Sequence, residues 1–258
     1  MPDGNGPFPL IVFIHGGGFS GGDKTDITAP FSVSNSKSRG YAFASIQYTL
    51  MSGSQKGFPN AVEDALAAIR FLRAKAADYC INPDKIGVAG FSAGGYFVNM
   101  VAALSGASNH GFDLASLGNE GVSSKVQAAV GLSGLSDITQ MDTWAPGGMM
   151  GQSHCQYNVN FFGFNPCTAT GANAEIVARS NPMTWVTTQN CANLPPIRLE
   201  HSKADNITPW QGSEALINKY KQACPSVEAV GRYYDGGGHG SGYSDAATIY
   251  GFLDQYLK

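Results

Sequence analysis

One serine in this chain has neighbours that suit nucleophilic chemistry. Residues 90–94 read GFSAG, after an apolar run and before a run rich in Ala, Val and Met. In a G-x-S-x-G pattern, a sharp strand-to-helix turn presents the serine hydroxyl above a sheet. The flanking glycines let the backbone and the helix approach closely. We therefore expect Ser92 to be a nucleophile, rather than a serine that merely begins a helix.

A run of glycines could supply donors for a developing oxyanion, which acyl transfer requires. His15 is followed by three glycines, Gly16 to Gly18, at the end of an apolar run. Without Cβ atoms, their N–H groups can turn inward. The residue after the nucleophile, Ala93, should add a further amide. The alternative is a phosphate-binding loop, but no G-K-[ST] follows and the G-x-G-x-x-G spacing is absent.

A serine hydroxyl needs a base, and the base needs an orienting carboxylate. Of the five histidines, His239 has the suitable place, in a glycine-rich loop between the last expected strand and the last expected helix. Asp205 follows the fifth expected strand and completes the chain order Ser, acid, His. Asp137, after the fourth expected strand, is the competing acid. Asp235 is too near His239 in sequence to be favoured.

These side chains must be positioned by an alternation of strands and helices. Apolar runs predict strands at 9–15, 41–48, 85–91, 126–132, 196–201 and 228–234. Helical patterns fall at 27–38, 60–79, 92–104, 212–222 and 243–257. The alternation predicts an α/β fold with a mostly parallel central sheet and helices on both faces.

The segment 133–195 breaks this rhythm. It is rich in Gly and Asn and holds the aromatic residues Trp144, Tyr157, Phe161, Phe162, Phe164 and Trp185. Long irregular segments in compact domains are usually lids or binding loops. We expect a single domain over residues 1–258, in which this insertion forms a cap or pocket wall. A surface excursion packed on its own aromatics is the alternative.

Composition limits the partners and the location. The formal net charge is −3, so there is no basic excess for nucleic acid or an anionic membrane surface. No apolar run reaches the ~18 residues of a membrane span. Residues 1–9 lack the pattern of a signal peptide. Charged residues make up 14%, against roughly 25% in an average soluble domain, which favours a secreted or periplasmic protein.

The five cysteines fit no metal-ligand spacing, so no metal is expected. Two disulfide pairings are conceivable, Cys155 with Cys167 and Cys191 with Cys224. The alternative is five unpaired thiols. An odd number of cysteines leaves at least one unpaired within the chain, and Cys80 is the remaining one.

Four motifs together, HGGGF, GFSAGG, HSKAD-x-x-TP and GGGHG, resemble those of α/β-hydrolase esterases. Among these, the chain resembles carbohydrate acetyl and feruloyl esterases, including the acetyl-xylan-esterase-like branch, and hormone-sensitive-lipase-like carboxylesterases. The resemblance runs from about Pro9 to the C-terminus. It implies the α/β-hydrolase fold and no cofactor. It also implies a catalytic triad of Ser92, Asp205 and His239, and an oxyanion hole built from the amides of Gly17, Gly18 and Ala93.

The chain departs from these families at its start. Members usually carry one or two antiparallel strands before the HGGG strand, and only about eight residues precede it here. Two explanations are open, a sheet truncated at this edge or a gene model that starts after the true N-terminus, and neither affects the expected triad.

The expected function is hydrolysis of short-chain acyl esters, among them acetyl or feruloyl esters of carbohydrates. The candidates for the substrate pocket are Phe19, Phe91, Trp144 and Tyr157. The sequence leaves two alternatives, an amidase or formamidase with the same triad, and a catalytically inactive binding module. Inactive members commonly lose the serine, the histidine or the glycines, and all are present here. The sequence does not set the oligomeric state.

Overall fold

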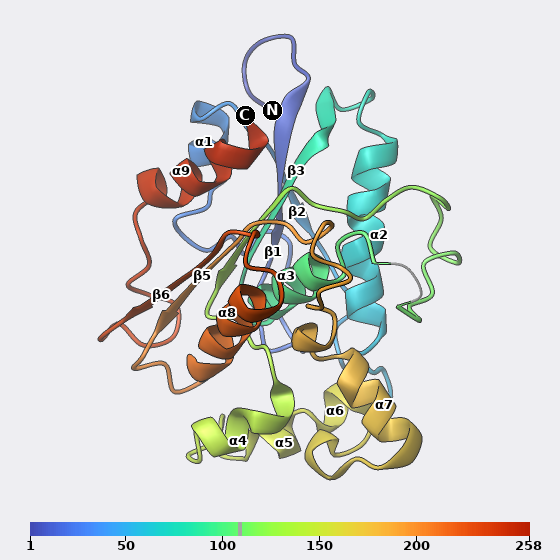
Figure 1. Ribbon diagram of the computed structural model, residues 1–258, viewed down its shortest axis with the longest axis vertical. Helices are drawn as coiled ribbons and strands as arrows, with labels where there is room; N and C mark the ends of the chain where they lie inside the picture. The colour runs from blue at the N-terminus through green and yellow to red at the C-terminus, as the bar shows by residue number, and fades with distance from the viewer. Residues whose placement is uncertain (108–109) are drawn as a thin grey trace.

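Six parallel strands form the centre of the protein (Figure 1). The computed structural model describes residues 1–107 and 110–258. The strand order is β2-β1-β3-β4-β5-β6, and every pairing is parallel. The strands are β1 (Phe8–Ile14), β2 (Ala42–Ile46), β3 (Ile81–Phe91), β4 (Ala128–Leu132), β5 (Ile197–Ser202) and β6 (Ala229–Tyr234). This confirms the expected parallel sheet, and no antiparallel strand precedes β1 in the described sheet.

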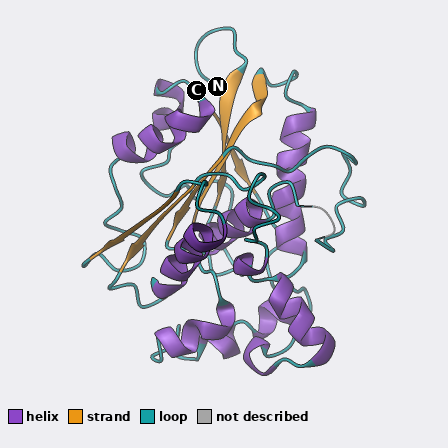
Figure 2. Cartoon of the chain, viewed as in Figure 1, coloured by secondary structure: helices purple, strands orange, loops and turns teal. Residues whose placement is uncertain are grey.

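Helices cover both faces of the sheet (Figure 2). Leu10, Val12 and Ile14 pack in one core, with the helices α2 (Asn60–Ala74), α3 (Ala93–Ala103) and α8 (Gln211–Ala223). Ile11 and Phe13 pack in the other, with α9 (Ala246–Leu257). The helix α1 (Val33–Ser38) lies beside α9 (Figure 1). Strands buried on both faces explain the continuous apolar runs in the sequence.

Helix α2 ends at Ala74, before the predicted residue 79, and two other helices begin later than the sequence patterns predict, because side-chain caps fix where they begin. Helix α1 begins after Ser32, whose hydroxyl accepts from the amide of Asn35 at 3.0 Å. Helix α9 begins after Asp245, whose Oδ1 accepts from the amide of Thr248 at 2.8 Å. Such caps satisfy amides that have no partner within the helix.

The insertion is more helical than expected. It contains α4 (Met141–Trp144), α5 (His154–Tyr157), α6 (Val159–Phe162) and α7 (Gly171–Arg179), with short 3-10 turns before α4, between α6 and α7, and after α7. These helices gather at the lower end of Figure 1, and both chain termini lie at the upper end. Phe161 anchors the insertion to the main core, where its ring stacks on Phe19 with centroids 4.2 Å apart.

Two disulfides have the pairings that the sequence allowed. Cys155–Cys167 lies within the insertion, and Cys191–Cys224 joins the segment before β5 to the end of α8. Cys80 is exposed, unpaired, and directly precedes β3. In the part of the chain that the structure describes, no helix is long and apolar enough to cross a bilayer.

Candidate active site

Ser92 occupies a tight turn between β3 and α3. Its backbone has φ 56° and ψ −118°, a positive-φ conformation outside the left-handed helical region, which is strained for a residue with a side chain. A Cβ at Gly90 would lie 2.6 Å from the carbonyl oxygen of Gly94, and a Cβ at Gly94 would overlap the carbonyl oxygen of Ile14. Only glycine on both sides of Ser92 allows α3 to lie this close to the strands.

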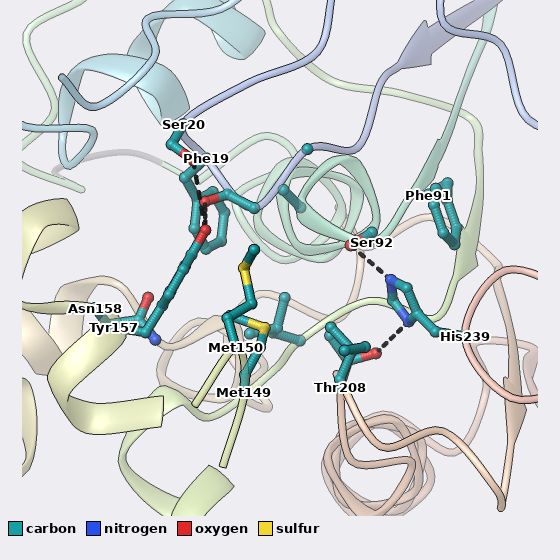
Figure 3. A pocket seen from close by; sticks show the side chains of 15 residues that line it. Phe19, Ser20, Phe91, Ser92, Met149, Met150, Tyr157, Asn158, Thr208 and His239 are labelled. Carbon is teal, nitrogen blue, oxygen red and sulfur yellow. Dashed lines mark hydrogen bonds between the residues drawn. The ribbon is translucent and has the colours of Figure 1, made fainter. Parts of the chain in front are cut away.

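The structure brings Ser92, His239 and Asp205 together. Nε2 of His239 lies 3.0 Å from Oγ of Ser92, and Nδ1 lies 2.8 Å from Oδ2 of Asp205 (Figure 3 shows the first contact). Asp205 lies in the turn after β5, and His239 lies in the loop between β6 and α9. The three segments meet because the carboxyl ends of parallel strands share one edge of the sheet.

The Asp205 carboxylate is held in its charged form. Its Oδ1 accepts from the amides of Ile207 and Thr208, both at 2.9 Å. Burial raises the pKa of Asp205, but hydrogen bonds from His201 and His239 outweigh burial and hold the pKa well below its usual range. An ionised Asp205 accepts the Nδ1 proton of His239, which leaves Nε2 free to accept a proton from Ser92.

The two other aspartates considered from the sequence lie elsewhere. Oδ1 of Asp137 accepts from the amide of Thr139 at 3.0 Å and so caps a 3-10 turn. Asp235 is exposed and pairs with Lys203 at 3.4 Å. The structure therefore places Asp205 beside His239, whereas Asp137 and Asp235 make other contacts.

A buried glutamate anchors the loop that carries His239. Glu200 on β5 is fully buried, and its carboxylate accepts from Nε of Arg198 at 2.8 Å and from the amide of Ser244 at 2.6 Å. Arg232 on β6 donates to the carbonyl of Gly242 at 3.0 Å. These contacts attach the far end of the loop to the two strands that precede it.

The predicted oxyanion residues Gly17, Gly18 and Ala93 all line the cavity above Ser92. Gly17 and Gly18 have φ of 116° and 58°, values that favour glycine. Ala93 is the first residue of α3, where amides lack a partner within the helix. The Tyr157 hydroxyl donates to the carbonyl oxygen of Gly18 at 2.9 Å. That bond fixes the orientation of the peptide group between Gly18 and the next residue.

The cavity above Ser92 has a volume of about 450 Å³. Phe19, Phe91 and Tyr157 line it, as the sequence predicts (Figure 3). Trp144 does not line it; a Cβ at Gly212 would lie 3.2 Å from the Trp144 ring, so Trp144 packs against the start of α8. Sequence reasoning missed the other contributors to the wall, which are Ser20, Leu135, Met149, Met150, Asn158, Ile207 and Thr208.

Within the described residues, one group has the spacing of metal ligands, Asp142 with Cys155 and Cys167. The two sulfurs form a disulfide, so they are not thiolate ligands. Asp142 instead accepts from the amide of His154 at 2.6 Å, and its Oδ1 lies 3.0 Å from Nδ1 of His154. Nε2 of His154 donates to the carbonyl of Ile207 at 3.1 Å, which links the insertion to the turn of Asp205.

These features together define a protein of the α/β-hydrolase fold. They are a parallel sheet, a serine at a strand-to-helix turn, and an acid and a histidine that follow later strands. This chain belongs to the family described as BD-FAE, whose profile matches residues 1–220.

Curated and solved relatives agree with this class. LipM of Mycobacterium tuberculosis, a probable carboxylic ester hydrolase, is 25% identical over 221 residues, which are 85% of this chain and 46% of LipM. The chain thus spans less than half the length of that relative. The truncated form of a carbohydrate esterase from gut microbiota superposes with a TM-score of 0.79 at 24% identity, covering 98% of this chain and 87% of that chain. The acetyl ester-xyloside bifunctional hydrolase of Caldicellulosiruptor lactoaceticus superposes with a TM-score of 0.72 at 20% identity. The match covers 99% of this chain and 83% of that chain.

Proposed function

We propose that the protein is a serine carboxylesterase. The observation that carries this proposal is the hydrogen-bonded series Ser92, His239, Asp205, with distances of 3.0 and 2.8 Å, at the wall of an open cavity. A nucleophile within reach of a base that is itself oriented by a third group is the signature of an activated serine. The carboxylic ester hydrolase among the relatives supports an ester as the substrate.

The mechanism has two steps. His239 takes the Ser92 proton as Oγ attacks the ester carbonyl, and Asp205 stabilises the imidazolium that forms. The amides of Gly17, Gly18 and Ala93 stabilise the oxyanion. The alcohol leaves with the proton from His239, and water then hydrolyses the acyl-enzyme by the same transfers in reverse.

The substrates to test first are short-chain acyl esters, with acetyl and feruloyl esters of carbohydrates among them. The cavity wall is mostly apolar, with Phe19, Leu135 and Ile207 among its residues, which suits an acyl chain or ring. Carbohydrate esterases among the solved structures with this fold motivate a sugar as the alcohol. Two disulfides support a secreted or periplasmic location, since disulfides persist in oxidising compartments.

The test compares p-nitrophenyl acetate, butyrate and octanoate as substrates of the wild type and of Ser92→Ala. We expect activity that falls with acyl length and is lost in the variant, together with fluorophosphonate labelling of the wild type alone. Full activity in Ser92→Ala would rule out this nucleophile. An aryl formamide hydrolysed faster than the esters would instead indicate an amidase, and an unlabelled wild type would indicate an inactive member of the fold.

A further inference from the structure

A second cavity lies next to the cavity of Ser92. Its volume is about 240 Å³, and it shares two wall residues, Ser20 and Tyr157, with the first cavity. The two cavities therefore adjoin at this pair of side chains. The Ser20 hydroxyl lies 3.5 Å from the Tyr157 hydroxyl, which is itself bonded to the carbonyl of Gly18. We call this second cavity the polar pocket.

The polar pocket differs in chemistry from the cavity of Ser92. Its wall carries the hydroxyls of Ser20 and Ser52 and the amides of Gln152 and Asn160, and none of its described wall residues is charged. These four side chains are exposed, so water satisfies them until a ligand arrives. Hydroxyl and amide groups both donate and accept hydrogen bonds. Such a wall suits a neutral ligand with several hydroxyls, rather than an anion or a hydrocarbon.

One turn of the insertion contributes to both cavities. Met149 and Met150 line the cavity of Ser92, and Gln152 lines the polar pocket. Met149 and Gln152 exchange two backbone hydrogen bonds, of 2.8 and 3.1 Å. The turn is thus closed on itself, with its apolar side chains on the cavity that holds Ser92 and its amide on the polar one. A ligand that spans both cavities would meet an apolar region and then a polar one.

We propose that the polar pocket binds the hydroxylated alcohol half of the ester, such as a pyranose ring, while the acyl carbonyl lies at Ser92. This proposal rests on the proposed esterase function and assigns the alcohol side of its substrate. Gln152 and Asn160 are the groups that would bond to ring hydroxyls, and Tyr157 is the wall between the two halves. A site built to bond hydroxyls discriminates strongly against an analogue that lacks them.

The test uses two acetates that differ in ring hydroxyls, methyl 2-O-acetyl-β-D-xylopyranoside and cyclohexyl acetate. The measured quantity is the ratio of kcat/KM for the sugar acetate to kcat/KM for cyclohexyl acetate, from acid release in a pH-stat. The variants are Gln152→Ala and Asn160→Ala. Gln156→Ala is the matched control, because Gln156 is an exposed glutamine of α5 that does not line either cavity.

We expect Gln152→Ala and Asn160→Ala each to lower this ratio about three- to tenfold, the effect of one lost hydrogen bond, while Gln156→Ala keeps the wild-type ratio. A wild type that hydrolyses both acetates, with the same ratio in all three variants, overturns the polar pocket and leaves the esterase proposal intact. A wild type that hydrolyses neither acetate, nor p-nitrophenyl acetate, overturns both.

Discussion

Nε2 of His201 lies 3.2 Å from Oδ2 of Asp205, the same oxygen that contacts His239. His201 is fully buried, and its Nδ1 lies 2.8 Å from the hydroxyl of Ser213 on α8. Nε2 also lies 2.7 Å from the carbonyl of Thr208, and two acceptors around one nitrogen require it to carry the proton. His201 does not line the cavity of Ser92, so it acts on the site through Asp205 as a positioning residue.

Replacing His201 should weaken the support of Asp205. Because a hydrogen bond to a charged group contributes about 1.5–3 kcal/mol, we expect His201→Ala to lower kcat/KM about 10- to 100-fold. The pKa of Asp205, followed by NMR titration of its carboxyl carbon, should rise toward its ordinary value. Ser213→Ala is the control, since it leaves Nε2 of His201 in place and should have a smaller effect. An unchanged pKa of Asp205 in His201→Ala would contradict the positioning role.

Asp205 should also make stability depend on pH. Its pKa in the folded state lies below the ordinary value, so its contribution to the free energy of unfolding is present above the unfolded pKa of about 3.9 and is lost as pH falls below it. Urea unfolding at pH 7, 5 and 3 should show Asp205→Asn less stable than the wild type at pH 7, with the difference shrinking toward pH 3. A difference that is constant with pH would refute the lowered pKa.

The same Asp205→Asn variant should be nearly inactive at pH 7. An asparagine at this position favours the wrong tautomer of the base, and in a serine protease that change lowers kcat about 10⁴-fold. Far-ultraviolet circular dichroism of the variant checks that the fold is kept.

Gly18 is expected to tolerate no side chain. It has φ of 58°, and a Cβ there would overlap the Tyr157 hydroxyl. We expect Gly18→Ala to displace an amide that we propose as an oxyanion donor, and to lower kcat for p-nitrophenyl acetate about 10²-fold or more. Gly40→Ala is the matched control, because Gly40 also has a positive φ, of 77°, and a Cβ added there would meet no atom within 4 Å. Equal activity of the two variants would mean that Gly18 has no role beyond its backbone conformation.

The two disulfides should differ in their effect on activity. In the loop-entropy account, removing Cys155–Cys167 or Cys191–Cys224 costs about 3 and 4 kcal/mol of stability, from sequence separations of 12 and 33. Only the first has both cysteines in the insertion, beside Tyr157 and the turn at Met149. Double serine variants should therefore both melt earlier, but Cys155→Ser/Cys167→Ser alone should raise KM. A raised KM in both would show that the effect follows general stability.

The sequence predicted those candidate site residues whose place follows from the neighbouring residues in the chain. Ser92 could be predicted as the nucleophile because its turn requires glycines on both sides. His239 could be predicted as the base because it follows the last strand. The choice of Asp205 over Asp137 depended on which strand end faces His239, and only the three-dimensional arrangement settles that. The order Ser, acid, His fits Asp137 as well as Asp205, so chain order alone did not separate them.

The cavity wall could not be predicted in the same way. Met149 and Met150 lie in a turn between short helices, so no periodic pattern indicates where they point. Their position depends on contacts remote in sequence, such as Asp142 with His154 and His154 with the carbonyl of Ile207. Trp144 shows the converse: aromatic composition predicted a place in the pocket, but its ring packs against α8.

The unpaired Cys80 offers a means of attachment to a surface. It precedes the first residue of β3, and Ser92 follows the last. Alongside it, β1 pairs from Phe8 with Ile81 to Ile14 with Gly90, a rise of about 20 Å, so the thiol and the serine lie at opposite ends of the sheet. Because the other cysteines form disulfides, a maleimide-bearing support should couple at Cys80 alone and hold every molecule with its cavity toward the solution.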